Sequence, residues 1–241
     1  MIELSDRLQA MEESATIAMS QKSRELKAEG LDVISLSLGE PDFNTPEFIK
    51  DAAIQGMKDN YTKYTPVPGY EDLRQAISNK FKRDNNLDYP INQIVVSTGA
   101  KQSIANVVLS MVNNGDEVII PAPYWVSYIE IVKVSEGIPV AISAGIENDF
   151  KITGAQLESA ITEKTKMIIF STPCNPTGSV YSKEELRDLA DVLVRYPHIV
   201  IIADEIYEHI NFGTKHESLA QFDEIKDQVV TINGVSKAWA M

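Results

Sequence analysis

The sequence contains a single cysteine, Cys174, so an internal disulfide is impossible. It also lacks any apolar run near the roughly 20 residues of a membrane-spanning helix. Its first residues lack the apolar core of a secretory signal peptide. A chain with so little cysteine fits a reducing compartment. We therefore expect a cytoplasmic protein that does not associate with a membrane.

Positive charge is scarce: 22 Lys and Arg stand against 35 Asp and Glu, for a net charge of −13. Binding to a nucleic-acid backbone requires clustered Lys and Arg that displace counterions from phosphates, and the basic residues here are scattered. The three histidines, His198, His209 and His216, do not have metal-ligand spacing, and His209 lies where a helix after Asp204 should run. We expect neither a nucleic-acid partner nor a bound metal.

Apolar residues, in contrast, make up 44% of the chain and form alternating strand-like and helix-like patterns. Strands are expected at 94–97, 118–120, 138–142, 167–171, 199–203 and 229–235. Helices are expected at 14–29, 101–112, 125–134, 153–161 and 182–195, with a capping box at 182–185 and a C-cap at Gly30. Near the N-terminus, 33–38 reads as a short extended segment, and Thr45 and Pro46 as the N-cap and first residue of a helix. Buried strands separated by helices predict a three-layer α/β/α fold with a mostly parallel sheet.

Four chemically useful side chains stand at or just after the ends of these expected strands. Lys237 follows 229–235, Asp204 ends 199–203 with Tyr207 shortly after, and Asn175 follows 167–171. Ligands of open α/β sheets bind at the carboxyl edge of the strands. An amine, a carboxylate, a phenol and an amide are what pyridoxal 5'-phosphate requires: a Schiff-base lysine, an acid for the pyridine nitrogen, and donors for the ring oxygen.

The segments around these residues carry a family resemblance. Residues 123–128, 175–178, 203–208 and 236–241 together resemble a class I pyridoxal-phosphate aminotransferase of fold type I, and most of all the bacterial aspartate aminotransferases. The resemblance runs from about Ser5 to Met241. It implies that 1–44 belong to an N-terminal arm or small domain, and that 45–241 form a cofactor-binding large domain. It also implies a C-terminal truncation, because the family continues past this point with a small domain and two functional arginines.

The resemblance assigns the cofactor contacts. Lys237 would form the Schiff base, Asp204 would bind the pyridine nitrogen, and Tyr207 and Asn175 would bind the ring 3-oxygen. Trp125 would stack on the ring. The turn at Gly99, Ala100 and Lys101, where a helix begins with free backbone amides, would hold the phosphate. Tyr64 would reach the phosphate of a neighbouring subunit, which implies a homodimer with shared sites. Taken singly, these residues have ordinary alternatives: a surface lysine, a helix-capping Asp, an Asn-Pro turn, a core Trp and a loop Tyr.

Substrate contacts also follow from the resemblance. Gly39, Trp125 and Asn175 match substrate-binding positions, and Ser14, Thr16 and Lys101 match residues around the distal carboxylate of a dicarboxylic substrate. A lysine there favours acidic amino acids by charge. The expected reaction is amino transfer between an L-amino acid, foremost aspartate, and 2-oxoglutarate.

Other functions use the same site. An aromatic, alanine or prephenate aminotransferase and a pyridoxal-phosphate carbon–sulfur lyase share the cofactor chemistry. An aminotransferase-like regulatory module would keep the fold without the reaction. A fragment of this length could also be inactive on its own.

Overall fold

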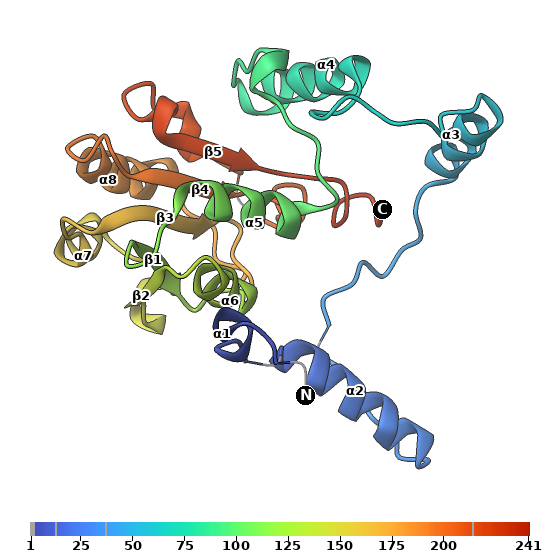
Figure 1. The fold of residues 1–241 in the computed structure, drawn as a ribbon, viewed down its shortest axis with the longest axis horizontal. Helices are drawn as coiled ribbons and strands as arrows, with labels where there is room; N and C mark the ends of the chain where they lie inside the picture. Colours follow the sequence, from blue (N-terminus) through green and yellow to red (C-terminus); the bar gives the residue numbers. More distant parts are fainter. Residues whose placement is uncertain (1–2, 13, 37, 214) are drawn as a thin grey trace.

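A five-stranded parallel sheet with strand order β2-β1-β3-β4-β5 forms the centre of the computed structural model (Figure 1). The structure describes residues 3–12, 14–36, 38–213 and 215–241. The strands are β1 (Glu117–Ala122), β2 (Ile138–Ser143), β3 (Thr165–Ser171), β4 (Val200–Asp204) and β5 (Val229–Ile232). Because every neighbouring pair is parallel, all five carboxyl ends lie at one edge of the sheet.

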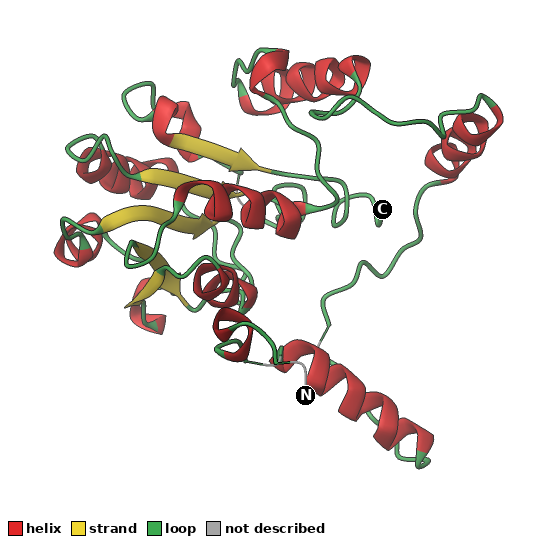
Figure 2. Cartoon of the chain, in the orientation of Figure 1, coloured by secondary structure: helices red, strands yellow, loops and turns green. Residues whose placement is uncertain are grey.

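Helices cover both faces of this sheet, which confirms the predicted three-layer fold. One face packs against α5 (Ala100–Met111) and α6 (Ser127–Val134), and the other against α7 (Gly154–Ala160) and α8 (Lys183–Leu193) (Figure 2). In β3, Met167 and Ile169 join the first core, whereas Ile168 and Phe170 join the second. Alternate side chains of a strand point to opposite faces, so a strand buried on both sides must be apolar throughout.

Local signals set the ends of two covering helices. Ser182 accepts from the Glu185 amide while the Glu185 carboxylate accepts from the Ser182 amide, so the predicted capping box is present at α8. Thr153 and Gln156 form a second capping box at α7. These boxes satisfy amides that have no partner inside the helix.

The N-terminal part lies outside the sheet layers (Figure 1). It contains α1 (Asp6–Gln9), α2 (Ala15–Ala28), α3 (Glu47–Lys58) and α4 (Glu71–Lys80), and α4 continues as a π-helical turn (Phe81–Asn85). The predicted helix at 14–29 is confirmed, and Gly30 follows it with φ +87°, a conformation that favours glycine. Short 3₁₀ turns occupy Ile91–Gln93, Ile146–Asn148, Leu219–Gln221 and Lys226–Gln228. No helix in the described ranges is both long and apolar enough to cross a membrane.

Three local predictions were wrong: the strand at 94–97, the N-cap at Thr45 and the helix after Asp204. Residues 94–97 form no strand; instead, the Val96 amide donates to Pro68 O at 3.0 Å. The described residues of the expected extended segment 33–38 belong to no helix or strand, and Ser37 lies outside the described residues. Thr45 does not cap α3: Pro46 takes that position, and the Thr45 hydroxyl donates to Ala240 O at 2.5 Å. No helix follows Asp204, because the Glu205 amide donates to Ile232 O and the chain closes into turns. In each case a partner distant in sequence competes with the local preference.

Candidate cofactor and substrate site

The carboxyl edge of the sheet gathers the predicted functional residues from four different strands. Asp204 is the last residue of β4 and lies in register with Ser171 of β3 and Ile232 of β5. The loops that follow the neighbouring strands carry Trp125, Asn175 and Lys237. Parallel pairing therefore brings residues up to 112 positions apart in sequence, Trp125 and Lys237, to the same edge of the molecule.

Asp204 is a buried carboxylate, 3% exposed, with two neutral hydrogen-bond donors. The Tyr128 hydroxyl donates to Oδ2 at 2.6 Å, and the Ile206 amide donates to Oδ1 at 3.2 Å. Burial raises the pKa of Asp204, and the Tyr128 and Ile206 hydrogen bonds oppose that rise. No cationic side chain of the described residues bonds to this carboxylate. An ionised Asp204 is thus short of positive charge and suited to a ligand that brings a protonated nitrogen.

Tyr207 stands beside this carboxylate and is half-buried. Asn175 Nδ2 lies 3.5 Å from the Tyr207 hydroxyl, at the upper limit of hydrogen-bond distance. Burial raises the pKa of Tyr207, the nearby Asp204 charge adds to the rise, and the Asn175 contact opposes it. Tyr207 therefore stays a protonated hydrogen-bond donor at neutral pH.

Lys237 follows β5 in a helical turn in which the Trp239 amide donates to Val235 O at 3.1 Å. Its Nζ donates to Gly39 O at 3.1 Å and lies 5.8 Å from the centroid of the Tyr207 ring. Two predicted site residues 198 positions apart are thereby brought into direct contact. The amine lies close to Tyr207, which in turn neighbours Asp204.

The N-terminus of α5 supplies a second polar feature at this part of the fold. Gly99 precedes the helix with φ +86°, which a side chain would disfavour, and open space lies where its Cβ would be. Lys101, in the first turn, places Nζ 4.8 Å from the centroid of the Trp125 ring. A cation and an aromatic face from two predicted contact residues thus meet beside the first amides of the helix.

Three predicted residues do not join this group. Tyr64 lies in the connection between α3 and α4, which is drawn apart from the sheet edge in Figure 1, and its side chain is fully exposed. Ser14 precedes α2 and Thr16 lies in its first turn, and neither hydrogen-bonds to Lys101 in the described structure.

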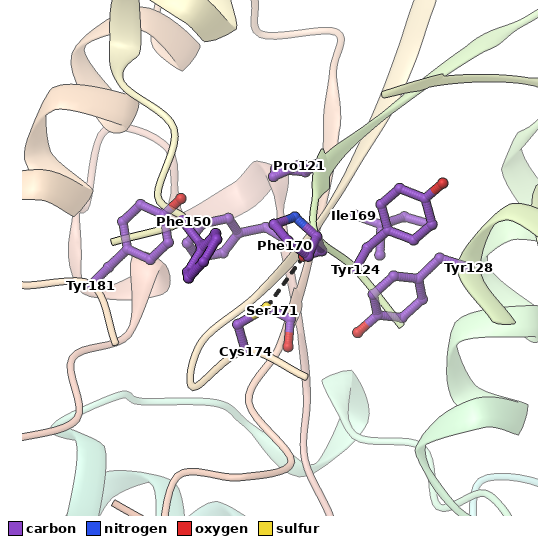
Figure 3. A pocket seen from close by; sticks show the side chains of 10 residues that line it. Pro121, Tyr124, Tyr128, Phe150, Ile169, Phe170, Ser171, Cys174 and Tyr181 are labelled. Atoms are coloured by element: carbon purple, nitrogen blue, oxygen red, sulfur yellow. Dashed lines mark hydrogen bonds between the residues drawn. The ribbon is translucent and has the colours of Figure 1, made fainter. Parts of the chain in front are cut away.

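Sequence reasoning assigned no role to Tyr128, although it lies in the segment 123–128 that carries the resemblance. The side chain is 2% exposed, and its ring stacks edge-on against Trp125 with centroids 5.5 Å apart. Tyr128 also lines a cavity of about 20 Å³ whose wall includes Ser171 and Cys174 (Figure 3). Its spacing of three residues from Trp125 was the available signal, since residues three apart share a helix face.

Comparison with known proteins places these residues in a family context. The family model for aminotransferase class I and II matches residues 31–241. A probable aspartate/prephenate aminotransferase of Rickettsia bellii is 51% identical over 240 residues, which are 99% of this chain and 60% of that protein. An aspartate aminotransferase of Bacillus sp. is also 51% identical over 240 residues, with coverage of 99% and 61%.

Solved structures agree. The aspartate aminotransferase of Rhizobium meliloti superposes with a TM-score of 0.96 at 41% identity and covers 100% of this chain. The Thermus thermophilus aspartate aminotransferase with maleate gives 0.95 at 40% identity, again over 100% of this chain. The chain spans about 60% of the length of these relatives. Since the family model covers most of the chain and the fold agrees throughout, this protein belongs to the aminotransferase class I and II family.

Proposed function

We propose that this chain forms the cofactor-binding part of a pyridoxal 5'-phosphate-dependent aminotransferase that moves an amino group between aspartate and 2-oxoglutarate. The observation that carries the proposal is the buried Asp204 carboxylate, which lacks a cationic partner among the described residues and lies beside Tyr207, itself near the Lys237 amine. Relatives at 51% identity bear the names aspartate or aspartate/prephenate aminotransferase.

The donor set fits this cofactor. A protonated pyridine nitrogen would supply the positive charge that Asp204 lacks, and Asp204 would hold that proton in place. Tyr207 and Asn175 would bind the ring oxygen. Trp125 offers a face for stacking, and the backbone amides at Gly99, Ala100 and Lys101 offer an anion site at the start of α5.

The protein's own residues would divide the work. When bound, pyridoxal phosphate supplies an electron sink for the pair left at the substrate Cα. Lys237 would anchor the cofactor through its amine and then carry the proton that leaves Cα. Asp204 would keep the ring nitrogen protonated during that transfer. The carbonyl of Gly39, which accepts from Lys237 Nζ, would orient the amine.

We also propose the wider organisation that the resemblance implied. Residues 1–44 would belong to an arm or small domain, and 45–241 to the large domain. The placement of α1 and α2 outside the sheet layers supports this division. The fully exposed Tyr64 supports a homodimer with shared sites, because its ring is free to meet a second subunit. The protein would act in the cytoplasm on amino acids and 2-oxo acids.

The decisive experiment combines spectroscopy with a substrate panel. We would titrate this chain with pyridoxal phosphate, and repeat the titration on a version extended past Met241 to the length of its relatives (the extended version). A new absorbance band lost on adding an amino acid supports the cofactor proposal. Amino transfer fastest with aspartate supports the substrate. Faster amino transfer with an aromatic amino acid, alanine or prephenate would assign that compound as the substrate in place of aspartate. Release of ammonia and a thiol would identify a carbon–sulfur lyase. A regulatory module would bind cofactor without turnover.

Tyr128→Phe tests whether the hydrogen bond from Tyr128 to Asp204 contributes to cofactor binding. Loss of the 2.6 Å hydrogen bond removes the side-chain donor to the carboxylate and raises its pKa further. A hydrogen bond to a charged group contributes about 1.5–3 kcal/mol, so the Kd for pyridoxal phosphate should rise by about 10–150-fold. Titration of the absorbance band measures the change. The matched control is Tyr124→Phe, a neighbouring tyrosine with no bond to Asp204. Equal Kd values for the two variants would contradict this role.

Lys101→Ser tests whether Lys101 recognises the distal carboxylate of an acidic substrate by its charge. A charge-assisted hydrogen bond to the distal carboxylate, at about 1.5–3 kcal/mol, corresponds to about 10–150-fold in kcat/KM for aspartate. Loss of the Lys101 contact with Trp125 would affect all substrates alike and costs only about 0.5–1 kcal/mol. We therefore expect the extended version of this variant to lose activity with aspartate far more than with phenylalanine. Equal losses would assign Lys101 to the phosphate site alone.

A further inference from the structure

The turn after β4 alternates residues of the proposed site with buried glutamates. Asp204 and Tyr207 belong to the site. Glu205 is 0% exposed and Glu208 is 7% exposed, and both bond to residues outside the proposed site. A buried carboxylate is costly unless it is hydrogen-bonded or paired with a cation. The partners of these two glutamates therefore indicate what the turn is attached to.

Glu205 is held by the segment that follows the turn. The Ser218 hydroxyl donates to Oε1 at 2.6 Å, and His216 Nε2 lies 3.0 Å from Oε2. Its backbone amide donates to Ile232 O, the last residue of β5, at 2.8 Å. Glu205 thus fixes the end of β4 to the end of β5.

Glu208 joins its own turn to two other segments of the chain, α4 with its π-helical turn and the loop after β5. Lys80 Nζ, from α4, donates to Oε1 and forms an ion pair with it. Asn85 Nδ2, from the π-helical turn, donates to Oε2 at 3.3 Å, and Asn233 Nδ2 donates to the same oxygen. His209 Nε2 lies 3.0 Å from Oε1. The carboxylate is therefore fully engaged, with Lys80 as its counter-charge.

These contacts connect the supports of two proposed site residues. Glu208 directly follows Tyr207 in the chain, and Asn233 is the first residue after β5, four positions before Lys237. Both polar atoms of the Asn233 side chain are hydrogen-bonded: Nδ2 donates to Glu208, and Oδ1 accepts from the Gly234 amide at 2.7 Å. One carboxylate thus holds the turn that carries Tyr207 and the start of the loop that carries Lys237.

A bound cation is a weaker explanation for this cluster. Oxygens of Glu205 and Glu208 and a ring nitrogen of His216 lie within 4.8 Å of one another. However, Lys80 already neutralises Glu208, and Ser218 and His216 already occupy the two oxygens of Glu205. All four oxygens of the two carboxylates therefore already have hydrogen-bond partners, whereas His216 Nδ1 is buried without a partner in the described structure.

We propose that Glu208 is a positioning residue that fixes the Lys237 loop relative to Tyr207, through Asn233. The inference rests on the proposed role of Lys237, and it predicts an effect on that lysine even without cofactor. In Glu208→Gln, an NH₂ group takes the place of one carboxylate oxygen. That NH₂ group then faces a hydrogen-bond donor, Lys80 on one side or Asn85 and Asn233 on the other, and the hydrogen bonds on that side are lost. The Lys237 loop then opens more often, because hydrogen bonds to a charged acceptor no longer hold it closed.

The test compares the reactivity of individual lysines in the chain without cofactor. Pulse labelling with an amine-reactive acetylating reagent, read by peptide mass spectrometry, gives a rate for each lysine. We expect Lys237 in Glu208→Gln to react about tenfold faster. This corresponds to a shift of about 1.4 kcal/mol in the opening equilibrium of the Lys237 loop. Lys226, whose amine donates to Asp88 O, serves as internal reference and should not change. The control variant is Glu130→Gln, which loses a comparable ion pair with Lys133 remote from this turn.

A second variant separates positioning from general loosening. Asn233→Ala removes the other end of the contact, so its effect on Lys237 should match that of Glu208→Gln, and the double variant should add little. Additive effects, equal acceleration of all lysines, or an unchanged Lys237 rate would overturn the proposal. Failure of the wild-type chain and its extended version to bind pyridoxal phosphate would refute the proposed function, yet the Lys237 rates would still decide the role of Glu208.

Discussion

Lys237→Ala is expected to abolish covalent attachment of pyridoxal phosphate and to reduce turnover of the extended version by at least about 10⁴-fold. A positioned acid–base group alone contributes about 10²–10⁴ in rate. This residue would in addition form the covalent link to the cofactor. Its Nζ donates to Gly39 O and lies 5.8 Å from the centroid of the Tyr207 ring, so the variant removes the amine and leaves the neighbouring phenol in place.

Covalent labelling measures this prediction directly. Borohydride reduction of the cofactor-loaded chain, followed by peptide mapping, should place the label on Lys237 in the wild type and give no label in the variant. Lys226→Ala is the matched control, since the Lys226 amine also bonds to one backbone carbonyl. A label on a different lysine would remove Lys237 from the proposed mechanism.

The layered fold could be predicted because its signal is local. Continuous apolar runs such as 167–171 require burial on both faces, and the intervening helices carry their own start signals, as at Ser182. The predicted strand at 94–97 lacked a pairing partner in the described part of the chain, and sequence patterns do not reveal partners. Thr45 had the right residue type for an N-cap, but a hydrogen bond to Ala240, far along the chain, took its hydroxyl.

The site shows the same division between local and distant information. Motif segments and strand ends predicted that Asp204, Tyr207, Asn175 and Lys237 are functional, and the parallel sheet places all four at its carboxyl edge. Their roles remain proposals. The support of Asp204 by Tyr128 could not be predicted, because it joins residues 76 positions apart and depends on how α6 packs on the sheet. Spacing indicates which residues share a surface, whereas a hydrogen bond needs the relative placement of two surfaces.

Asp204→Asn is expected to stabilise the chain without cofactor while weakening the proposed function. Burial raises the pKa of Asp204, so the ionised carboxylate is less stable in the folded chain than in the unfolded chain. An amide of the same shape removes that charge. It can still accept from the Ile206 amide, and it can donate to the Tyr128 hydroxyl. Functional sites often retain such destabilising groups.

The sign of the pH dependence follows from the raised pKa. Below the ordinary pKa near 3.8, Asp204 is protonated in both folded and unfolded chains, and the ionisation cost is absent. The cost appears as pH rises from there to the folded-state pKa, and is constant above it. The stability advantage of Asp204→Asn should therefore be largest above the folded-state pKa of Asp204 and shrink as the pH falls toward 4. In a chain of this size, about 1 kcal/mol corresponds to about 2–4 °C in Tm, so calorimetry can resolve the difference.

A control variant and a measurement with cofactor distinguish the Asp204 effect from a general change in stability. Asp191→Asn changes an exposed aspartate paired with Arg187 at 3.5 Å, and should alter stability by less than about 0.5 kcal/mol at any pH. With pyridoxal phosphate present, the wild type should become more stable than Asp204→Asn. The wild type gains stability in proportion to ligand occupancy, whereas Asp204→Asn, without a counter-charge for the ring nitrogen, gains less. A variant that is less stable than the wild type at neutral pH would mean that the Asp204 charge is already compensated in the fold. In that case the absence of a cationic partner could not be the feature that selects the cofactor.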